Sequence, residues 1–151
     1  MSFVFKDIRQ FYGDKKIFSA TELIISGGKV TGLFGENGSG KTTLLNYLSG
    51  NLFGDLKKNI LFLDKFPGVY VDLFVEEIIC LYMLENNLKS IEQKKLFTIL
   101  RVGELYGYKI RHLSAGQLQR LKIYISLISK NDLILFDEPF NTLDKNYKNI
   151  F

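Results

Sequence analysis

One short motif limits what this chain can fold into more than any other feature. Residues 35–42 (GENGSGKT) match the pattern G-x-x-x-x-G-K-[ST] at every position. Three glycines let the backbone turn tightly and direct its N–H groups towards an anion, and a helix that starts near Gly40 adds the positive end of its dipole. Lys41 can then reach the β- and γ-phosphates of a nucleotide, and the Thr42 hydroxyl can bind Mg²⁺. The motif therefore predicts a phosphate loop with the nucleotide-binding residues Gly35, Asn37, Gly38, Ser39, Gly40, Lys41, Thr42 and Thr43.

The apolar residues around the phosphate loop predict alternating strands and helices. Residues 29–34 are rich in strand formers, and 133–136 form a continuous apolar run, which is typical of a strand covered on both faces. The other predicted elements are a strand over 59–63 and helices over 42–52, 75 to about 100, and 118–128. This alternation predicts an α/β fold with a parallel sheet. A strand before the loop and an amphipathic helix after it disfavour the alternative, a glycine-rich turn with no ligand.

Two adjacent carboxylates end the last predicted strand. Asp137 and Glu138 follow the apolar run, and Pro139 stops the strand directly afterwards. Two carboxylates at this place are costly unless something compensates for them. Magnesium gives Asp137 a role as a ligand together with Thr42, and Glu138 is then placed to polarise the water that attacks the γ-phosphate. The alternative is an acidic strand end that is only solvated, and the phosphate loop upstream disfavours it.

A motif downstream of the phosphate loop carries a resemblance to a known family. Residues 112–120 (HLSAGQLQR) resemble the signature L-S-G-G-Q of the ATP-binding cassette (ABC) family, with alanine in place of one glycine. The serine and glutamine of this motif also form a capping box, so taken alone it favours only a well-capped helix. Together with the phosphate loop and the Asp-Glu-Pro sequence, in that order, it makes the resemblance specific. The resemblance implies that two subunits pack head to tail and that the partner's ATP is contacted by Ser114, Ala115, Gly116 and Gln117.

The resemblance also implies a fold and further site residues. The fold would be a P-loop NTPase-type parallel-sheet core with an N-terminal antiparallel β part. Residues 1–151 would form one incomplete ABC ATPase domain, with a helical subdomain inserted over approximately 67–128. Tyr12 is the candidate for stacking on adenine, although a core or surface tyrosine fits nearly as well. Asp144 lies where the family has its D-loop.

Two features depart from the family. Lys65 stands where the family has a glutamine that touches magnesium, and a lysine side chain offers donors only. The chain ends at Phe151, before the strand and the γ-phosphate-contacting histidine that follow the D-loop in the family. Its one histidine, His112, is expected to be a helix-entry or packing residue. Because a missing central strand leaves unpaired backbone groups, we expect residues 1–151 alone to be unstable or marginally folded.

Composition excludes some classes of partner. The net charge of +4 is spread along the chain in small groups, which favours a solvated surface over a nucleic-acid groove, and no nucleic-acid partner is expected. A single cysteine, Cys80, fits a reducing compartment. No targeting signal opens the sequence, and no apolar run is long enough to cross a bilayer. A role at a membrane would therefore need a partner.

The expected function follows from the resemblance. The chain would be the ATPase subunit of an ABC transporter, with ATP and Mg²⁺ as cofactors and Lys41 and Glu138 as catalytic residues. Its partners would be a membrane-spanning permease subunit and a second ABC ATPase domain in a homo- or heterodimer, at the cytoplasmic face of the cell membrane. Two alternatives stay open. One is a soluble ABC-type accessory ATPase, and the other is a non-catalytic ATP-binding remnant, which Lys65 and the missing histidine favour.

Overall fold

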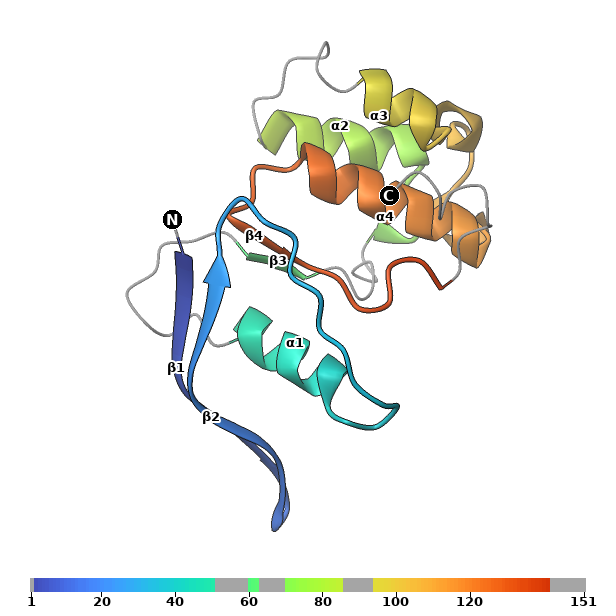
Figure 1. Ribbon diagram of the computed structural model, residues 1–151. Helices are drawn as coiled ribbons and strands as arrows, with labels where there is room; N and C mark the ends of the chain where they lie inside the picture. Colours follow the sequence, from blue (N-terminus) through green and yellow to red (C-terminus); the bar gives the residue numbers. More distant parts are fainter. Residues whose placement is uncertain (1, 51–59, 63–69, 86–93, 142–151) are drawn as a thin grey trace. The chain divides into compact units, whose positions relative to one another are not determined.

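A computed structural model describes residues 2–50, 60–62, 70–85 and 94–141. The chain divides into two units, which are described separately. The first contains Met1–Phe62 and Asp132–Asp137, and the second contains Leu63–Asn131 and Glu138–Phe151. The first unit carries the strands and one helix, and the second carries the other helices (Figure 1).

The first unit begins with a long antiparallel hairpin. β1 (Ser2–Tyr12) pairs with β2 (Lys15–Ser26) along nearly its whole length. Gly13 has φ +57 in the connecting turn, a backbone angle that glycine adopts without steric cost. The hairpin confirms the antiparallel N-terminal part that the family resemblance implied.

The alternation of buried and exposed residues in β1 shifts by one position halfway along the strand. Phe3 and Phe5 are buried at alternate positions, as a strand with one covered face requires. Strict alternation would next bury Asp7. Instead Asp7 has φ 52, a left-handed angle that aspartate tolerates better than most residues, and the buried residue is Ile8. The turn in the backbone thus keeps the carboxylate exposed and the isoleucine in the core.

A short parallel ladder and one helix complete the first unit. β3 (Ile60–Phe62) pairs in parallel with β4 (Leu133–Leu135), so the ladder joins two distant parts of the sequence. α1 (Lys41–Gly50) covers the residues predicted as a helix over 42–52, apart from the last two, which lie outside the described residues. The hairpin, the helix and β4 share one core, formed by Phe3, Phe5, Ile8, Leu45, Leu48 and Leu135.

The predicted strand over residues 29–34 is wrong in this structure. The segment leads from the hairpin into the phosphate loop without strand geometry, and in the part of the chain that the structure describes no ladder includes it. Val30 is 102% exposed and Phe34 is 91% exposed. Strand-forming side chains favour an extended backbone, but a strand exists only where a neighbour accepts and donates its hydrogen bonds. The sequence pattern could not show whether that neighbour is present.

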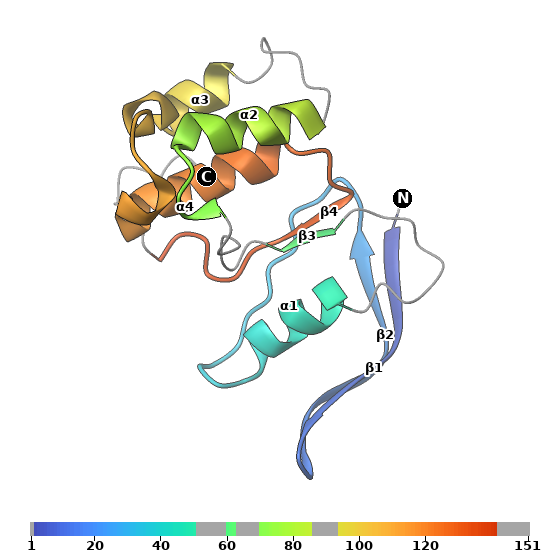
Figure 2. The same cartoon turned by 180° about the vertical axis from the view of Figure 1, so that it is seen from behind.

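The second unit is helical. Its elements are α2 (Val75–Glu85), α3 (Lys94–Ile99) and α4 (Ala115–Ile128), with short 3-10 turns at η2 (Val102–Leu105) and η3 (Ile110–His112). Helix α2 lies alongside α4, as the two opposite views in Figures 1 and 2 both show. The helix predicted from residue 75 to about 100 is thus seen as two helices, with 86–93 outside the described residues. The core of this unit includes Val75, Ile78, Ile79, Leu100, Val102, Leu105, Leu121, Tyr124 and Ile125.

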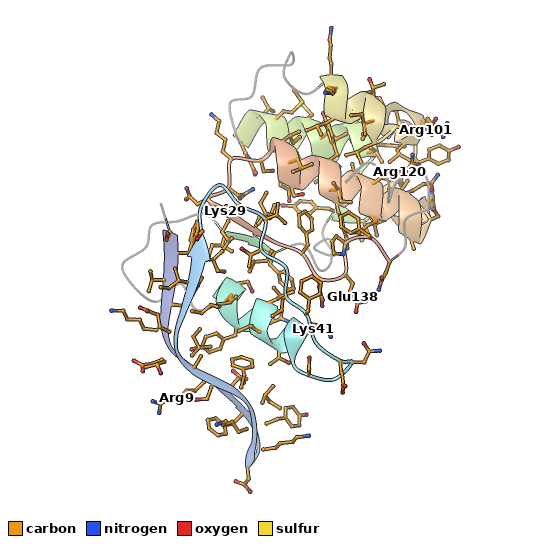
Figure 3. The ribbon with its side chains drawn as sticks, in the orientation of Figure 1. Arg9, Lys29, Lys41, Arg101, Arg120 and Glu138 are labelled. Atoms are coloured by element: carbon orange, nitrogen blue, oxygen red, sulfur yellow. The ribbon has the colours of Figure 1, made fainter. Side chains whose placement is uncertain are left out.

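A buried arginine fixes α4 against η2. Arg120 is only 8% exposed, so its guanidinium must be satisfied within the protein. It donates to the Leu100 carbonyl at 3.3 Å and lies 3.7 Å from a carboxylate oxygen of Glu104. Arg101 forms an ion pair with the same glutamate. Figure 3 labels both arginines, which lie near each other in the second unit. These contacts hold the first turns of α4 in place, where the signature residues lie.

Candidate functional site

The phosphate loop has the backbone angles that its glycines permit. Gly38 has φ +80 and Gly40 has φ +94, both in the range that residues with a Cβ rarely adopt. A Cβ on Gly35 would lie 2.7 Å from Ser39 Oγ, and one on Gly40 would lie 2.7 Å from Ile17 Cγ2. Gly38 and Gly40 are therefore required by their backbone angles, and Gly40 also by its close approach to β2, whereas the Ser39 hydroxyl beside Gly35 can rotate away.

Helix α1 presents unpaired donors at the end of this loop. The first helical bond runs from the Leu44 N–H to the Gly40 carbonyl at 2.8 Å. The N–H groups of Lys41, Thr42 and Thr43 precede that bond and so have no acceptor within the helix. The first turn contains no acidic residue that would occupy them. Such a helix start attracts an anion through its N–H groups and its dipole.

Lys41 places a positive charge over the same loop. Its Nζ donates to the carbonyl of Gly35 at 2.9 Å and to that of Glu36 at 2.8 Å. The Lys41 side chain therefore folds back across the phosphate loop. Figure 3 labels this residue at helix α1. An ammonium held by neutral carbonyls can exchange these acceptors for phosphate oxygens, which bind it more strongly.

Two predicted magnesium ligands lie together in the first unit. Thr42 Oγ1 donates to Asp137 Oδ2 at 2.6 Å, although the residues are 95 positions apart in the sequence. The contact depends on the first unit's core, in which β4 packs with α1, because Asp137 lies two residues after the end of β4. A hydroxyl and a carboxylate are the hard oxygen ligands that Mg²⁺ prefers, and it is usually bound by one or two carboxylates plus substrate phosphates. The pair therefore fits magnesium beside the phosphate loop.

Glu138 has an unusual backbone and a fixed side chain. Its φ is 45, in the left-handed region, at the point where the chain turns into Pro139. Its carbonyl accepts a hydrogen bond from the Asn141 N–H at 3.2 Å, and its carboxylate accepts one from the Asn141 side-chain amide. Glu138 belongs to the second unit, and its action on a γ-phosphate stays a prediction.

The predicted capping box at the start of α4 is confirmed. Ser114 Oγ accepts from the Gln117 N–H at 3.3 Å, and the Ser114 N–H donates to Gln117 Oε1 at 2.8 Å. Ser114 and Ala115 are exposed, while Gly116 and Gln117 are half-buried. The capping box establishes only the helix start. Contact of these residues with a partner's ATP remains a prediction.

The structure gives less information on the contacts of the other predicted site residues. Tyr12 ends β1 with its side chain 85% exposed, and its stacking on adenine stays a prediction. Asp144 and Lys65 lie outside the described residues. Three contacts were not foreseen from the sequence. In the first unit Ile17 lies against Gly40, and in the second unit Asn141 bonds to Glu138 and Gln119 bonds to the Pro139 carbonyl. The first of these contacts depends on a register shift that leaves Ile17 unpaired in β2, for which the sequence carries no signal.

No helix in the described ranges has both the length and the apolar character needed to span a membrane.

Comparison with known proteins gives a consistent result. A sequence model of the family described as ABC transporter matches residues 18–141. The zinc import ATP-binding protein ZnuC of Wigglesworthia glossinidia brevipalpis is 32% identical over 156 residues, which cover 96% of this chain and 65% of ZnuC. An uncharacterized ABC transporter ATP-binding protein of Methanocaldococcus jannaschii is 28% identical over 148 residues, covering 92% of this chain and 56% of that protein. The chain thus spans less than two thirds of the length of either relative.

A solved structure supports the fold. A putative ABC transporter ATP-binding protein from Pyrococcus furiosus superposes with a TM-score of 0.74 at 24% identity, covering 99% of this chain and 81% of that one. The fold class predicted from the sequence is confirmed by this likeness.

Proposed function

This chain belongs to the ABC transporter family, and we propose that it is an ATP-hydrolysing subunit that energises solute transport through a separate membrane subunit. The observation that carries the proposal is the hydrogen bond of 2.6 Å between Thr42 and Asp137. It joins the end of the phosphate loop to the acidic end of β4, so that anion-binding donors and magnesium ligands meet in one unit.

The phosphate loop would bind ATP through several of its own groups. The unpaired N–H groups at the start of α1 would donate to phosphate oxygens, and Lys41 would leave the carbonyls of Gly35 and Glu36 for the β- and γ-phosphates. Thr42 and Asp137 would hold Mg²⁺, which would neutralise part of the negative charge on the phosphates. Tyr12 would stack on the adenine.

Hydrolysis would depend on Glu138. Its carboxylate would accept a proton from water as the water oxygen bonds to the γ-phosphorus. The bond from that phosphorus to the bridging oxygen of the β-phosphate would break, and ADP and phosphate would leave. The partner ATPase domain would contact this ATP through its copies of Ser114, Ala115, Gly116 and Gln117, in a head-to-tail dimer to which Asp144 also contributes. The helical subdomain over approximately 67–128 would carry these signature residues, and the dimer would act at the cytoplasmic face of the membrane.

Two substitutions test ATP binding and turnover separately. Charge-assisted hydrogen bonds contribute about 1.5–3 kcal/mol each, so Lys41→Met should weaken ATP binding by about 10- to 150-fold. Glu138→Gln should bind Mg-ATP as the wild type does and release far less phosphate. Calorimetry measures the first effect and phosphate release the second. Equal release from wild type and Glu138→Gln would remove Glu138 from its role, and wild-type binding without release would favour the ATP-binding module.

The transporter assignment needs its own experiment. We expect the protein to co-purify with an integral membrane protein from detergent-solubilised membranes of the source organism. Recovery in the soluble fraction alone, with active turnover, would support the accessory ATPase instead.

A further inference from the structure

We propose that Asn141 and Gln119 are positioning residues that hold Glu138 in the orientation needed for hydrolysis. The inference rests on the proposed function, because it assigns a role to Glu138 in ATP turnover. It adds two residues outside the phosphate loop, and both act through the segment that carries the glutamate.

The backbone at Glu138 needs support from its surroundings. Its φ of 45 lies in the left-handed region, which residues with a Cβ rarely adopt. The following residue is Pro139, which disfavours helical angles in the residue before it. A backbone of this kind persists only where neighbouring contacts determine it. Asn141 and Gln119 make such contacts with this segment.

Asn141 supplies the support from within the segment. Its N–H donates to the Glu138 carbonyl at 3.2 Å, which closes the turn, and its side-chain amide donates to the Glu138 carboxylate. Glu138 is exposed, so burial does not fix the direction of its side chain. One residue thus holds both the main chain and the carboxylate of the glutamate.

Gln119 supplies the support from α4. Its Nε2 donates to the Pro139 carbonyl at 2.9 Å, and this contact is partly buried. The helix is itself well fixed, because the capping box closes its start and Leu121 and Ile125 are fully buried. The peptide that follows Pro139, one residue beyond the glutamate, is therefore attached to a rigid helix. Gln119 thus gives the turn a support from α4 in addition to the bonds from Asn141.

The expected effect falls on turnover and not on binding. A general base must lie within hydrogen-bond reach of the proton that it accepts, and a displacement of about 1 Å can cost 100-fold in rate. We expect Asn141→Leu and Gln119→Met each to lower kcat by about 3- to 30-fold, within that bound. Neither side chain belongs to the phosphate loop, so KM for ATP and the affinity for Mg-ATP should stay within twofold.

Matched variants separate positioning from general damage. Gln119→Lys keeps an N–H donor at similar reach and should restore kcat to within about threefold of wild type, since hydrogen bonding to the carbonyl is retained. Thr98→Val in α3 removes a comparable bond from a side chain to a backbone carbonyl, Thr98 Oγ1 to Lys94 at 2.9 Å, and should leave kcat unchanged. In a Glu138→Gln background, Asn141→Leu should cause no further loss. An equal loss in that background, or a loss that appears in KM, would overturn the proposal.

A second measurement does not depend on turnover. Hydrogen–deuterium exchange at the Asn141 N–H should accelerate at least tenfold in Gln119→Met, because the turn that protects it loses its attachment to α4. If the wild-type chain released no phosphate, the proposed hydrolysis would fail, and this exchange rate would still decide whether Gln119 holds the Glu138 segment. Unchanged exchange would refute the support from α4.

Discussion

Replacing Gly40 by alanine tests how the hairpin supports the phosphate loop. A Cβ at this position would lie 2.7 Å from Ile17 Cγ2, closer than such atoms approach in real structures. Isoleucine is β-branched and stiff at χ1, so this methyl group cannot easily move aside. The backbone angle adds a second cost, because Gly40 has φ +94. Alanine at position 40 would therefore introduce both backbone strain in the loop and a steric clash with Ile17 of β2.

The two costs can be estimated separately. A left-handed backbone costs an L-residue about 1–2 kcal/mol. An extra methyl group in a packed contact costs about 1–3 kcal/mol. The sum of about 2–5 kcal/mol is a large share of the about 5–15 kcal/mol that stabilises a typical domain. We expect Gly40→Ala to lower the free energy of unfolding of the first unit by this amount, or to displace the loop and weaken ATP binding instead.

The assay is a cycle of four proteins: wild type, Gly40→Ala, Ile17→Ala and the double variant. Urea unfolding gives stability, and calorimetry gives ATP affinity. Because Ile17→Ala removes Cγ2, the double variant should recover the steric cost and keep only the backbone cost of about 1–2 kcal/mol. Gly13→Ala is the matched control, since Gly13 has φ +57 and nothing within 4 Å of a Cβ. Additive effects of the two single substitutions would refute the proposed contact, as would a Gly40→Ala variant that is no less stable than Gly13→Ala and binds ATP no more weakly.

Two further substitutions test the magnesium ligands and the start of α4. Thr42→Val removes the hydroxyl that donates to Asp137 and should raise the Mg²⁺ concentration needed for tight ATP binding by about 10-fold or more, the loss typical even for groups one step removed from a metal. In EDTA, where no free Mg²⁺ is present, the ATP affinity should be the same for Thr42→Val and wild type. An equal loss of ATP affinity in EDTA would contradict a role of Thr42 in metal binding. Ser114→Ala removes the acceptor for the Gln117 N–H and should destabilise the second unit by about 1 kcal/mol in urea unfolding. A stability equal to wild type would show that the capping box contributes little.

The phosphate loop and the helix starts were predictable because each depends on residues close together in the sequence. The three glycines, Lys41 and Thr42 form one motif, and Ser114 with Gln117 forms another. The lack of a strand over 29–34 was not predictable, because a strand depends on a partner elsewhere in the chain. Local propensity describes only the segment itself.

The supporting contacts of the site were missed for a related reason. Ile17 reaches Gly40 because the register of the hairpin shifts between Gln10 and Phe11, and such a shift leaves no mark in the pattern of apolar residues. The sequence places Asn141 three residues after Glu138 and gives no sign of a contact between them. The left-handed backbone at Glu138, with φ 45, occurs together with the hydrogen bond between the two side chains.

The β3–β4 ladder has a consequence for how the protein is made. Ile60 pairs with Leu133, and the larger segment of the second unit, Leu63–Asn131, lies between these residues in the sequence. At synthesis rates of about 5–20 residues per second, roughly 4–15 s separate the two strands as the ribosome produces them. Helices α2, α3 and α4 all precede β4 in the sequence, so their packing can begin during this interval, whereas the first unit must wait for β4. The phosphate loop therefore leaves the ribosome well before Asp137, and the nascent chain gains the proposed magnesium site only after helices α2 to α4 have been synthesised.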